Sequence, residues 1–260
     1  MDFLIYILAG AGVGFAVGLT GVGGGSLMTP LLLLFGFPPH IAIGTDLVYA
    51  AVTKSGGVVT HRRQGTIRWR IVLLLASASL PFSALTVAAL HFWLGDASNY
   101  SEALTTCLGF MLITTAFVLI FKKKLQGQPQ SEPSGFSAWA KNNATKLTLI
   151  MGAALGILVT LSSVGAGAFG TAILLVLYPR LPSIHIVGTD LAHAVPLTLV
   201  AGLGHLMLGN VDFILLGSLL IGSLPAIYAG TKLAAHLPDK VLQPVLAFTL
   251  LVLGSKYAFF

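Results

Sequence analysis

The sequence has little charge and only one cysteine. Of its 260 residues, 8% are charged and 56% are hydrophobic, whereas soluble domains usually carry about 25% charged residues. In water, such a chain would expose large apolar patches. Cys107 stands alone in an apolar run, which excludes a disulfide framework and a cysteine-based metal motif. These shortages exclude a soluble enzyme, a nucleic-acid-binding protein and a secreted module.

The apolar residues come in blocks of about 18 or more, the length that crosses a bilayer core. We therefore predict an all-α, polytopic integral membrane protein. The N-terminal segment lacks the positive region of a secretory signal, so we interpret it as a retained helix. The sequence contains no HExxH or GxSxG motif and no metal-spaced Cys and His set, so we expect no enzyme, no metal and no cofactor.

Two stretches of the sequence match at nearly constant offsets. GTDL at Gly44–Leu47 recurs 144 residues later at Gly188–Leu191. VGGGS at Val22–Ser26 aligns with VGAGA at Val164–Ala168, 142 residues later. A two-residue insertion between the blocks accounts for the change. Internal duplication is a common way to build a transporter, so the matches predict two homologous repeats.

We expect a first transmembrane repeat over residues 1–121, a cytoplasmic linker over 122–145 and a second repeat over 146–260. The linker is rich in Pro, Gly, Ser and Gln, which is typical of flexible segments. Each repeat holds five apolar segments, and the second of these is too short to cross a bilayer. The ten expected helices are 3–19, 26–37, 41–60, 69–92, 102–121, 146–161, 171–178, 184–208, 213–235 and 241–256.

The short second segment leaves two arrangements open. In one, the first two segments form a Gly-broken re-entrant hairpin, each repeat crosses three times, and the repeats are inverted. In the other, the first segment crosses fully, each repeat crosses four times, and the repeats are parallel. Residues 62–70 hold four arginines, whereas their counterpart 205–212 has no Lys or Arg. The positive-inside rule gives this asymmetry for inverted repeats, so we favour inversion.

Glycine-rich breaks stand at corresponding places in the two halves, GVGGGS at Gly21–Ser26 and GAGAFG at Gly165–Gly170. Irregular backbone at membrane depth is tolerated only where it is buried in protein or lines a wet cavity. Each break precedes a short helix, whose first N–H groups and dipole attract an anion, with hydroxyl donors from Ser26, Thr29 and Thr171. The alternative is that these glycines only allow close helix packing. Paired interruptions favour a transport site.

Two of the eight acidic residues, Asp46 and Asp190, fall early in expected membrane helices, at matching positions. Ionisable side chains are costly in a membrane and are functional by default; the alternative here is helix N-capping. Lys54, two turns beyond Asp46, is a candidate partner for it. His193 follows Asp190 by three residues on the same helix face and is a candidate proton relay, with a packing role as the alternative.

The sequence resembles the TauE/SafE family of sulfite exporters, also called toluene-sulfonate uptake permeases, over nearly its whole length. The resemblance rests on GVGGG with the apolar stretch after it (21–34), Pro-Pro-His (38–40), Gly44-Thr45 and HRRQG (61–65). The second half repeats the pattern with GAGAFGT, GTD and HLMLGN. It implies a secondary transporter of sulfur-containing anions, such as sulfite and organosulfonates, in the bacterial inner membrane.

The resemblance also implies which residues face the substrate. These are Gly23, Gly24, Gly25, Ser26, Gly165 and Gly167, with Thr45 and Thr189 at the rim. The family commonly has Gly-Thr-Ser where Asp46 and Asp190 stand here. Two carboxylates repel a dianion unless they are protonated or paired. We therefore expect Asp46 and Asp190 to carry protons coupled to transport, or to be neutralised by Lys54 and His193.

The leading prediction is alternating access of a midplane site between the two repeats, with sulfur-containing anions, protons and the lipid bilayer as partners. The opposite hypothesis is a cation transporter that uses Asp46 and Asp190 as ligands. An intramembrane enzyme and a sensory subunit are further alternatives. The sequence offers no catalytic set for the first, and only the linker as a partner-binding stretch for the second.

Overall fold

The structure is a computed structural model that describes residues 2–20, 25–95, 97–126, 143–234 and 239–259. Within these ranges all regular secondary structure is helical, which confirms the predicted all-α fold. The helices are α1 (Asp2–Thr20), α2 (Gly25–Leu34), α3 (Pro39–Arg63), α4 (Trp69–Ala89), the π-helix η1 (Leu90–Leu94), α5 (Ala97–Gln126), α7 (Ala144–Ser162), α8 (Ala168–Leu177), α9 (Ser183–Met207), α10 (Phe213–Ala234) and α11 (Asp239–Phe259).

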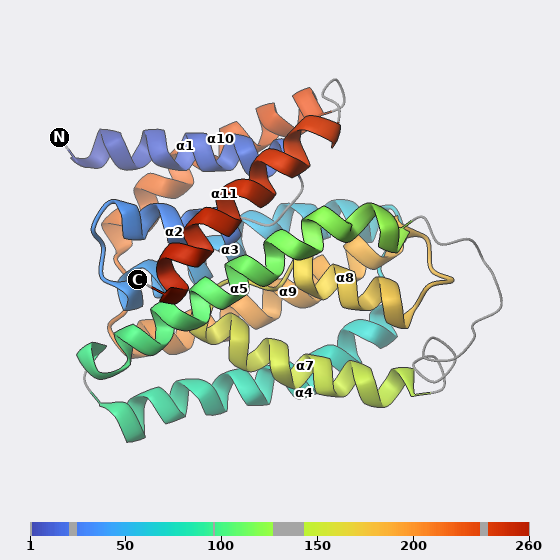
Figure 1. Cartoon of the computed structure of the whole chain (residues 1–260), viewed down its shortest axis with the longest axis horizontal. Helices are drawn as coiled ribbons and strands as arrows, with labels where there is room; N and C mark the ends of the chain where they lie inside the picture. The colour runs from blue at the N-terminus through green and yellow to red at the C-terminus, as the bar shows by residue number, and fades with distance from the viewer. Residues whose placement is uncertain (1, 21–24, 96, 127–142, 235–238, 260) are drawn as a thin grey trace.

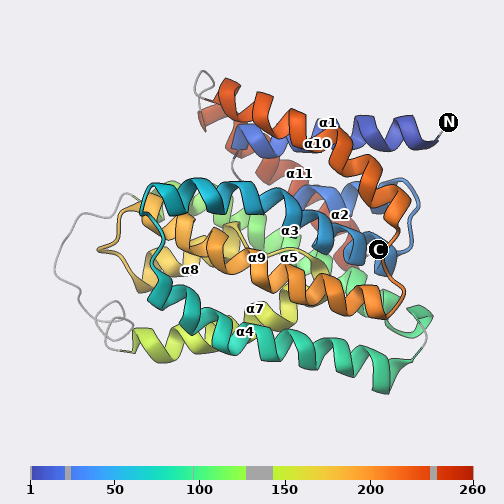
Figure 2. The ribbon, with the colours of Figure 1, turned by 180° about the vertical axis from the view of Figure 1, so that it is seen from behind.

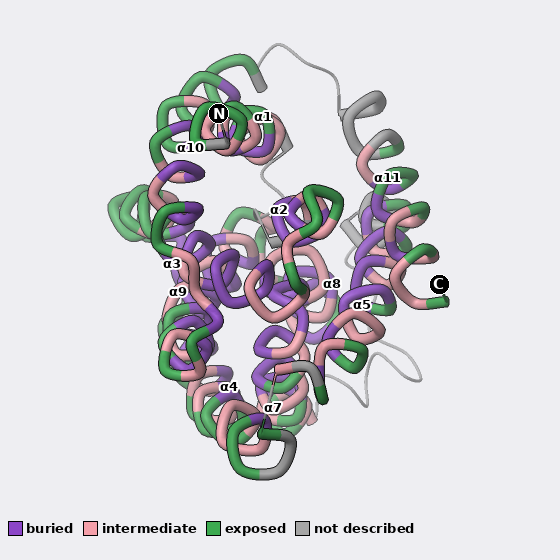
Figure 3. The backbone as a smooth tube through the Cα atoms, turned by 90° about the vertical axis from the view of Figure 1, so that its left-hand side faces the viewer, coloured by how far each residue is buried: buried purple, intermediate pink, exposed green. Residues whose placement is uncertain are grey.

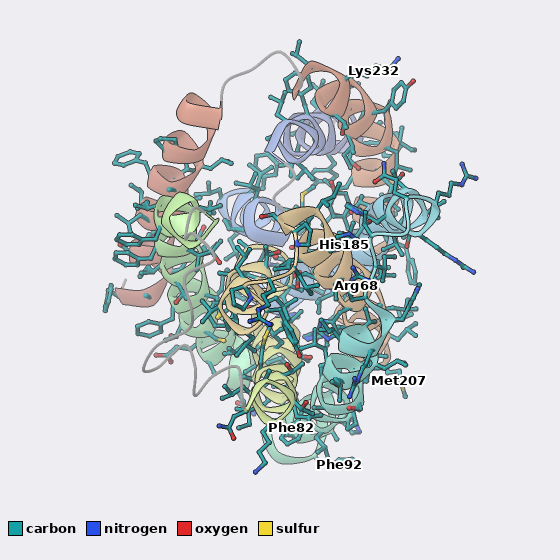
Figure 4. The ribbon with its side chains drawn as sticks, turned by 90° about the vertical axis from the view of Figure 1, so that its right-hand side faces the viewer. Arg68, Phe82, Phe92, His185, Met207 and Lys232 are labelled. Atoms are coloured by element: carbon teal, nitrogen blue, oxygen red, sulfur yellow. The ribbon has the colours of Figure 1, made fainter. Side chains whose placement is uncertain are left out.

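Several helices meet the requirements of a membrane span, as predicted. In the described ranges, five stretches are long and apolar enough to cross a bilayer: Trp69–Phe92, Asn99–Phe121, Ala144–Ser162, Ser183–Met207 and Phe213–Leu233. Large apolar side chains such as Phe82, Phe92 and Met207 lie exposed at the outside of the bundle (Figure 4). A surface of this kind suits lipid, and the chain is a multi-pass membrane protein.

The ten expected segments are all helical, with differences at their ends. The first short helix stops at Leu34, before Gly36, which adopts φ +84°. Pro39 is the first residue of α3, where a missing N–H costs nothing. Helix α5 continues past residue 122, the expected start of the linker, to Gln126. Residues 127–142 of the expected linker lie outside the described residues.

The short helices return toward the side from which their preceding helices came (Figures 1 and 2). Helix α1 runs inward from the end that carries both chain termini, and α2 returns toward that end. Helices α7 and α8 form a similar hairpin that enters from the opposite end, where α5 ends. Helices α3, α4 and α5 then run in alternating directions, as do α9, α10 and α11.

The main helix pairs each join one helix from the first half of the chain to one from the second. Helix α1 packs on α10, α4 on α7, α5 on α11, and α3 on α9. Buried residues are frequent on α2, α3, α8 and α9 in the bundle, whereas α1 and α10 at its edge carry many exposed residues (Figure 3). The two halves therefore interlock, and the short helices α2 and α8 reach the centre.

Candidate functional site

Asp46 and Asp190 lie in the second turn of α3 and of α9, at the same position of each helix. The N-cap residues are Pro38 and Pro182, so neither aspartate caps its helix and the capping alternative is wrong. Both side chains are buried, with 0% and 1% of their surface exposed. Two carboxyl groups at the centre of a membrane bundle therefore require polar partners.

Each carboxylate has one hydroxyl partner, and the two partners correspond. Thr29 Oγ1 in α2 donates to Asp46 Oδ2 at 2.5 Å, and Thr171 Oγ1 in α8 donates to Asp190 Oδ2 at 2.8 Å. A Cβ at Gly170 would overlap the Asp190 carboxylate, so this residue must be glycine for so close an approach. Both carboxylates thus sit near the first turns of α2 and α8, where the helix dipole favours negative charge.

Lys54 is buried in α3 and supplies the positive charge near both carboxylates. Its Nζ donates to the carbonyl oxygen of Ala166, 3.0 Å away, in the glycine segment between α7 and α8. Its charge acts on Asp46 and on Asp190. The corresponding residue of the second half is Thr198, so a single ammonium group serves two carboxylates.

Several buried polar atoms around these residues have no hydrogen-bond partner among the residues that the structure describes. They are Oδ1 of Asp46, Oδ1 of Asp190, Nδ1 of His193 and Oγ of Ser163. The Ser163 hydroxyl faces the Asp46 carboxylate. Because buried polar atoms are nearly always hydrogen-bonded, such a group of free atoms is suited to a polar ligand. We call Asp46, Lys54, Ser163, Asp190 and His193 the charged cluster.

His193 makes its one hydrogen bond outside the cluster. Its Nε2 is bonded to Ser79 Oγ of α4 at 2.7 Å, and the described structure has no direct hydrogen bond between His193 and Asp190. At the corresponding positions, 144 residues away, the hydroxyls of Tyr49 and Ser223 form the equivalent pair, but the described residues show no well-formed hydrogen bond between them. The α4–α9 contact therefore has a well-formed hydrogen bond, whereas the matching α3–α10 pair makes a looser contact.

The described residues include all of the second glycine segment and part of the first. Gly165 and Gly167 adopt φ +120° and +138°, which residues with side chains rarely reach, and they shape the turn into α8. Gly23 and Gly24 lie outside the described residues. Gly25 and Ser26 begin α2, but the Ser26 side chain also lies outside what the structure describes.

The expected rim residues, Thr45 and Thr189, hold loops of the opposite half. Thr45 Oγ1 accepts the backbone N–H of Asp212 at 3.1 Å, and Thr189 Oγ1 accepts that of Arg68 at 3.0 Å. Arg68 lies close to His185 at one end of the bundle (Figure 4). The two threonines are thus engaged with the loops after α9 and α3 rather than with the charged cluster.

Three members of this network were not among the predicted site residues: Ser79, Ser163 and the Ala166 carbonyl. Ser163 stands two residues before Gly165 and occupies a left-handed position (φ +58°) at the end of α7. Its neighbouring glycine segment is the only sequence signal for it. In the described ranges, no group of three His, Cys, Asp or Glu side chains gathers as a metal site.

Comparison with known proteins agrees with this architecture. The family model described as "Sulfite exporter TauE/SafE" matches residues 6–257. The probable membrane transporter protein YjnA of Bacillus subtilis is 37% identical over 96% of this chain and 97% of its own length. The probable membrane transporter protein YdhB of the same organism is 29% identical over 95% and 96%. No solved structure matches the chain. The chain belongs to the TauE/SafE sulfite exporter family of membrane transporters.

Proposed function

We propose that this transporter moves small sulfur-containing anions, sulfite and organosulfonates, with proton coupling, and that it binds them at the charged cluster. The observation that carries the proposal is a buried ammonium, Lys54, beside the start of α8 and among polar atoms that lack partners. A sulfonate or sulfite oxyanion needs a cation and several donors at close range. Lys54, the Ser163 hydroxyl and the α8 N-terminus can supply them.

The two carboxyl groups fit this proposal when they carry protons. An ionised carboxylate only accepts hydrogen bonds, whereas a protonated one also donates. The free Oδ1 atoms of Asp46 and Asp190 would then become donors to an anion. Protonation thus converts a repulsive group into a binding group, which links substrate binding to proton uptake.

The packing of the two halves supports alternating access between them. The His193–Ser79 hydrogen bond closes one contact, while the matching pair, Tyr49 and Ser223, makes no well-formed hydrogen bond within the described residues. Exchange of these two contacts would close one side of the cluster and open the other. Rocking of one half against the other around a fixed site is how many transporters with internal repeats work.

The cation hypothesis has one observation in its favour. The free oxygens of Asp46, Asp190 and Ser163 are the ligand type that hard cations prefer. Against it, the Lys54 ammonium lies in the same cluster and repels a cation. The anion proposal uses this ammonium, so the geometry supports it better.

Counterflow in proteoliposomes tests the proposal with labelled methanesulfonate, which stays charged, whereas protonated forms of sulfite leak through bilayers. We expect labelled anion to accumulate against an unlabelled internal pool, with competition by sulfite but not by chloride. Lys54→Gln, which retains a donor without the charge, should lose this activity, and protein-free vesicles are the blank. No flux of either anion together with flux of a metal cation would overturn the proposal.

A further inference from the structure

We propose that the charged cluster takes up its substrate as a monovalent anion together with one proton, so that each transport cycle moves no net charge. This inference rests on the proposed function, because it assumes that the cluster is the anion site. It adds the charge class of the substrate and the number of coupled protons. Hydrogensulfite and monoanionic sulfonates are then substrates, whereas dianions such as sulfate are not.

Within the described part of the chain few ionisable groups surround the cluster, so its charge can be counted. Asp46 and Lys54 come from α3, and Asp190 and His193 come from α9. The elements packed around them contribute hydroxyl and backbone groups. These are Thr29 of α2, Ser79 of α4, Ser163 after α7, and Thr171 of α8 with the Ala166 carbonyl before it.

Two further titratable groups are taken as neutral. The imidazole of His193 is held by Ser79 through Nε2, and we assign it as a hydrogen-bonding group. Tyr49, three residues after Asp46 in α3, is a phenol, and a phenol with an ordinary pKa of about 10 stays protonated at neutral pH. The count of charge therefore reduces to one ammonium and two carboxyl groups.

The charge of these three groups depends on the number of bound protons. With both carboxylates ionised the net charge is −1, with one proton it is zero, and with two it is +1. Uncompensated charge is costly at this depth, so the empty cluster holds one proton. A monovalent anion adds −1, and one more proton restores neutrality. That proton fills the last site, so a dianion would remain unbalanced.

The geometry provides a place for this proton. In each carboxyl group Oδ2 accepts a hydrogen bond from its threonine, whereas Oδ1 has no partner. A proton on Oδ1 can be donated to an oxygen of the bound anion, so it would lie between carboxyl and substrate. The O–H bond of the carboxyl group forms when the proton is taken up and breaks when it is released, and no bond of the anion changes. The proton enters with the anion from one side and leaves with it on the other.

Proteoliposomes with wild-type protein test the count directly. Initial uptake of labelled methanesulfonate is measured at membrane potentials set by valinomycin and potassium, with an internal pH dye. We expect one proton per anion, no dependence on potential, and competition by sulfate about tenfold weaker or more than by methanesulfonate, because the second charge stays unbalanced. A ratio other than one, a potential-dependent rate, or equal competition by sulfate would overturn the inference. Absence of all methanesulfonate and sulfite counterflow would instead contradict the proposed function.

Variants distinguish two hypotheses. In one, the total charge of the cluster sets the number of coupled protons; in the other, one particular residue carries every proton. Asp46→Asn and Asp190→Asn each leave one titratable carboxyl beside Lys54, so each should still move one proton per anion. The double variant is fixed at +1 and should exchange anions without proton movement. Loss of coupling in one single variant would overturn the count, because one carboxyl would then carry every proton. His193→Gln should keep the ratio at one, and a changed ratio would make the imidazole a third proton site.

A binding measurement on the wild-type protein tests the proton count without relying on variants that could fail to fold. Purified wild-type protein in weakly buffered detergent solution is mixed with methanesulfonate, and the pH change is followed. We expect one proton to be taken up per anion bound. Binding without proton uptake would overturn the inference.

Discussion

At the residue scale, one threonine hydroxyl positions each of the two buried carboxyl groups. Thr171 Oγ1 donates a hydrogen bond to Asp190, and Thr29 Oγ1 donates one to Asp46. Because the hydroxyl bonds to Oδ2 of the carboxyl group, Oδ1 remains available to the substrate and to the coupled proton. The threonines therefore position the atoms that we assign to substrate and proton.

Thr171→Val keeps the side-chain shape and removes the hydroxyl. The Asp190 carboxyl then loses its donor, and an unsatisfied buried polar group costs about 1–3 kcal/mol. We expect lower thermal stability of the detergent-purified protein and slower methanesulfonate counterflow. Thr171→Ser, which retains the hydroxyl, is the matched control. Equal stability and flux in the valine variant would remove Thr171 from the site.

Gly170→Ala tests the close approach of α8 to Asp190. The added methyl group would overlap the carboxylate, and overpacking of this kind costs about 1–3 kcal/mol. We expect reduced anion counterflow from protein that still inserts into the membrane. Gly217→Ala is the control, because a Cβ there meets nothing within 4 Å and the residue is also inside a helix. Similar losses in both variants would point to a general effect on glycine positions.

The site could be predicted from the sequence only in part. Asp46, Asp190 and Lys54 are identifiable because charges inside apolar segments are rare, and Thr29 and Thr171 because they follow the glycine breaks. The partner of Lys54 is a backbone carbonyl 112 residues away, and no residue type marks a carbonyl. The hydrogen bonds of Thr45 and Thr189 to distant loops likewise depend on how the halves interlock.

At the element scale, small residues allow the outer helices to pack closely. Gly10, Gly14 and Gly18 of α1 face the backbone of α10, where any Cβ would overlap it. Gly152 and Gly156 of α7 face the backbone of α4 in the same way. These are rows of glycine at every fourth position, a common contact between membrane helices.

Gly14→Val should therefore separate α1 from α10. A Cβ at Gly14 would lie 2.7 Å from Ser223 Cα, whereas a Cβ at Gly12 on the same helix meets nothing within 4 Å. We expect Gly14→Val to destabilise the protein by about 1–3 kcal/mol or more and Gly12→Val to have little effect. Thermal unfolding in detergent compares the two. Equal melting temperatures would show that α1 does not pack on α10 through this face.

Helix positions were predictable and helix partners were not. Long apolar segments define where helices lie, so all ten segments appear where expected. The helix ends depend on local backbone conformation, as at Gly36 with its positive φ after α2, and at Leu90–Leu94, where a π-helix follows α4. The glycine rows indicate a packing face of α1 and α7. They do not say that each face meets the other half of the chain.

At the scale of the whole molecule, the directions in which the helices run bear on whether the two halves of the chain are inverted or parallel. The start of α1 and the end of α11 lie at one end of the bundle, and the end of α5 lies at the other (Figure 1). Arg62 and Arg63, at the end of α3, share the α5 side. Clustered positive charge marks the cytoplasmic side. Both termini are then external if the hairpins are re-entrant.

A pair of reporter fusions tests this orientation. Alkaline phosphatase folds only outside the cytoplasm, and green fluorescent protein exported unfolded stays dark. We expect phosphatase activity without fluorescence when either reporter follows residue 260. An insertion directly after Gln126 should give the reverse, because the positive-inside rule places the end of α5 in the cytoplasm. A fluorescent C-terminal fusion would instead require four crossings in each half and parallel repeats. The rocking mechanism would then need an axis along the membrane normal, as it has in transporters built from parallel repeats.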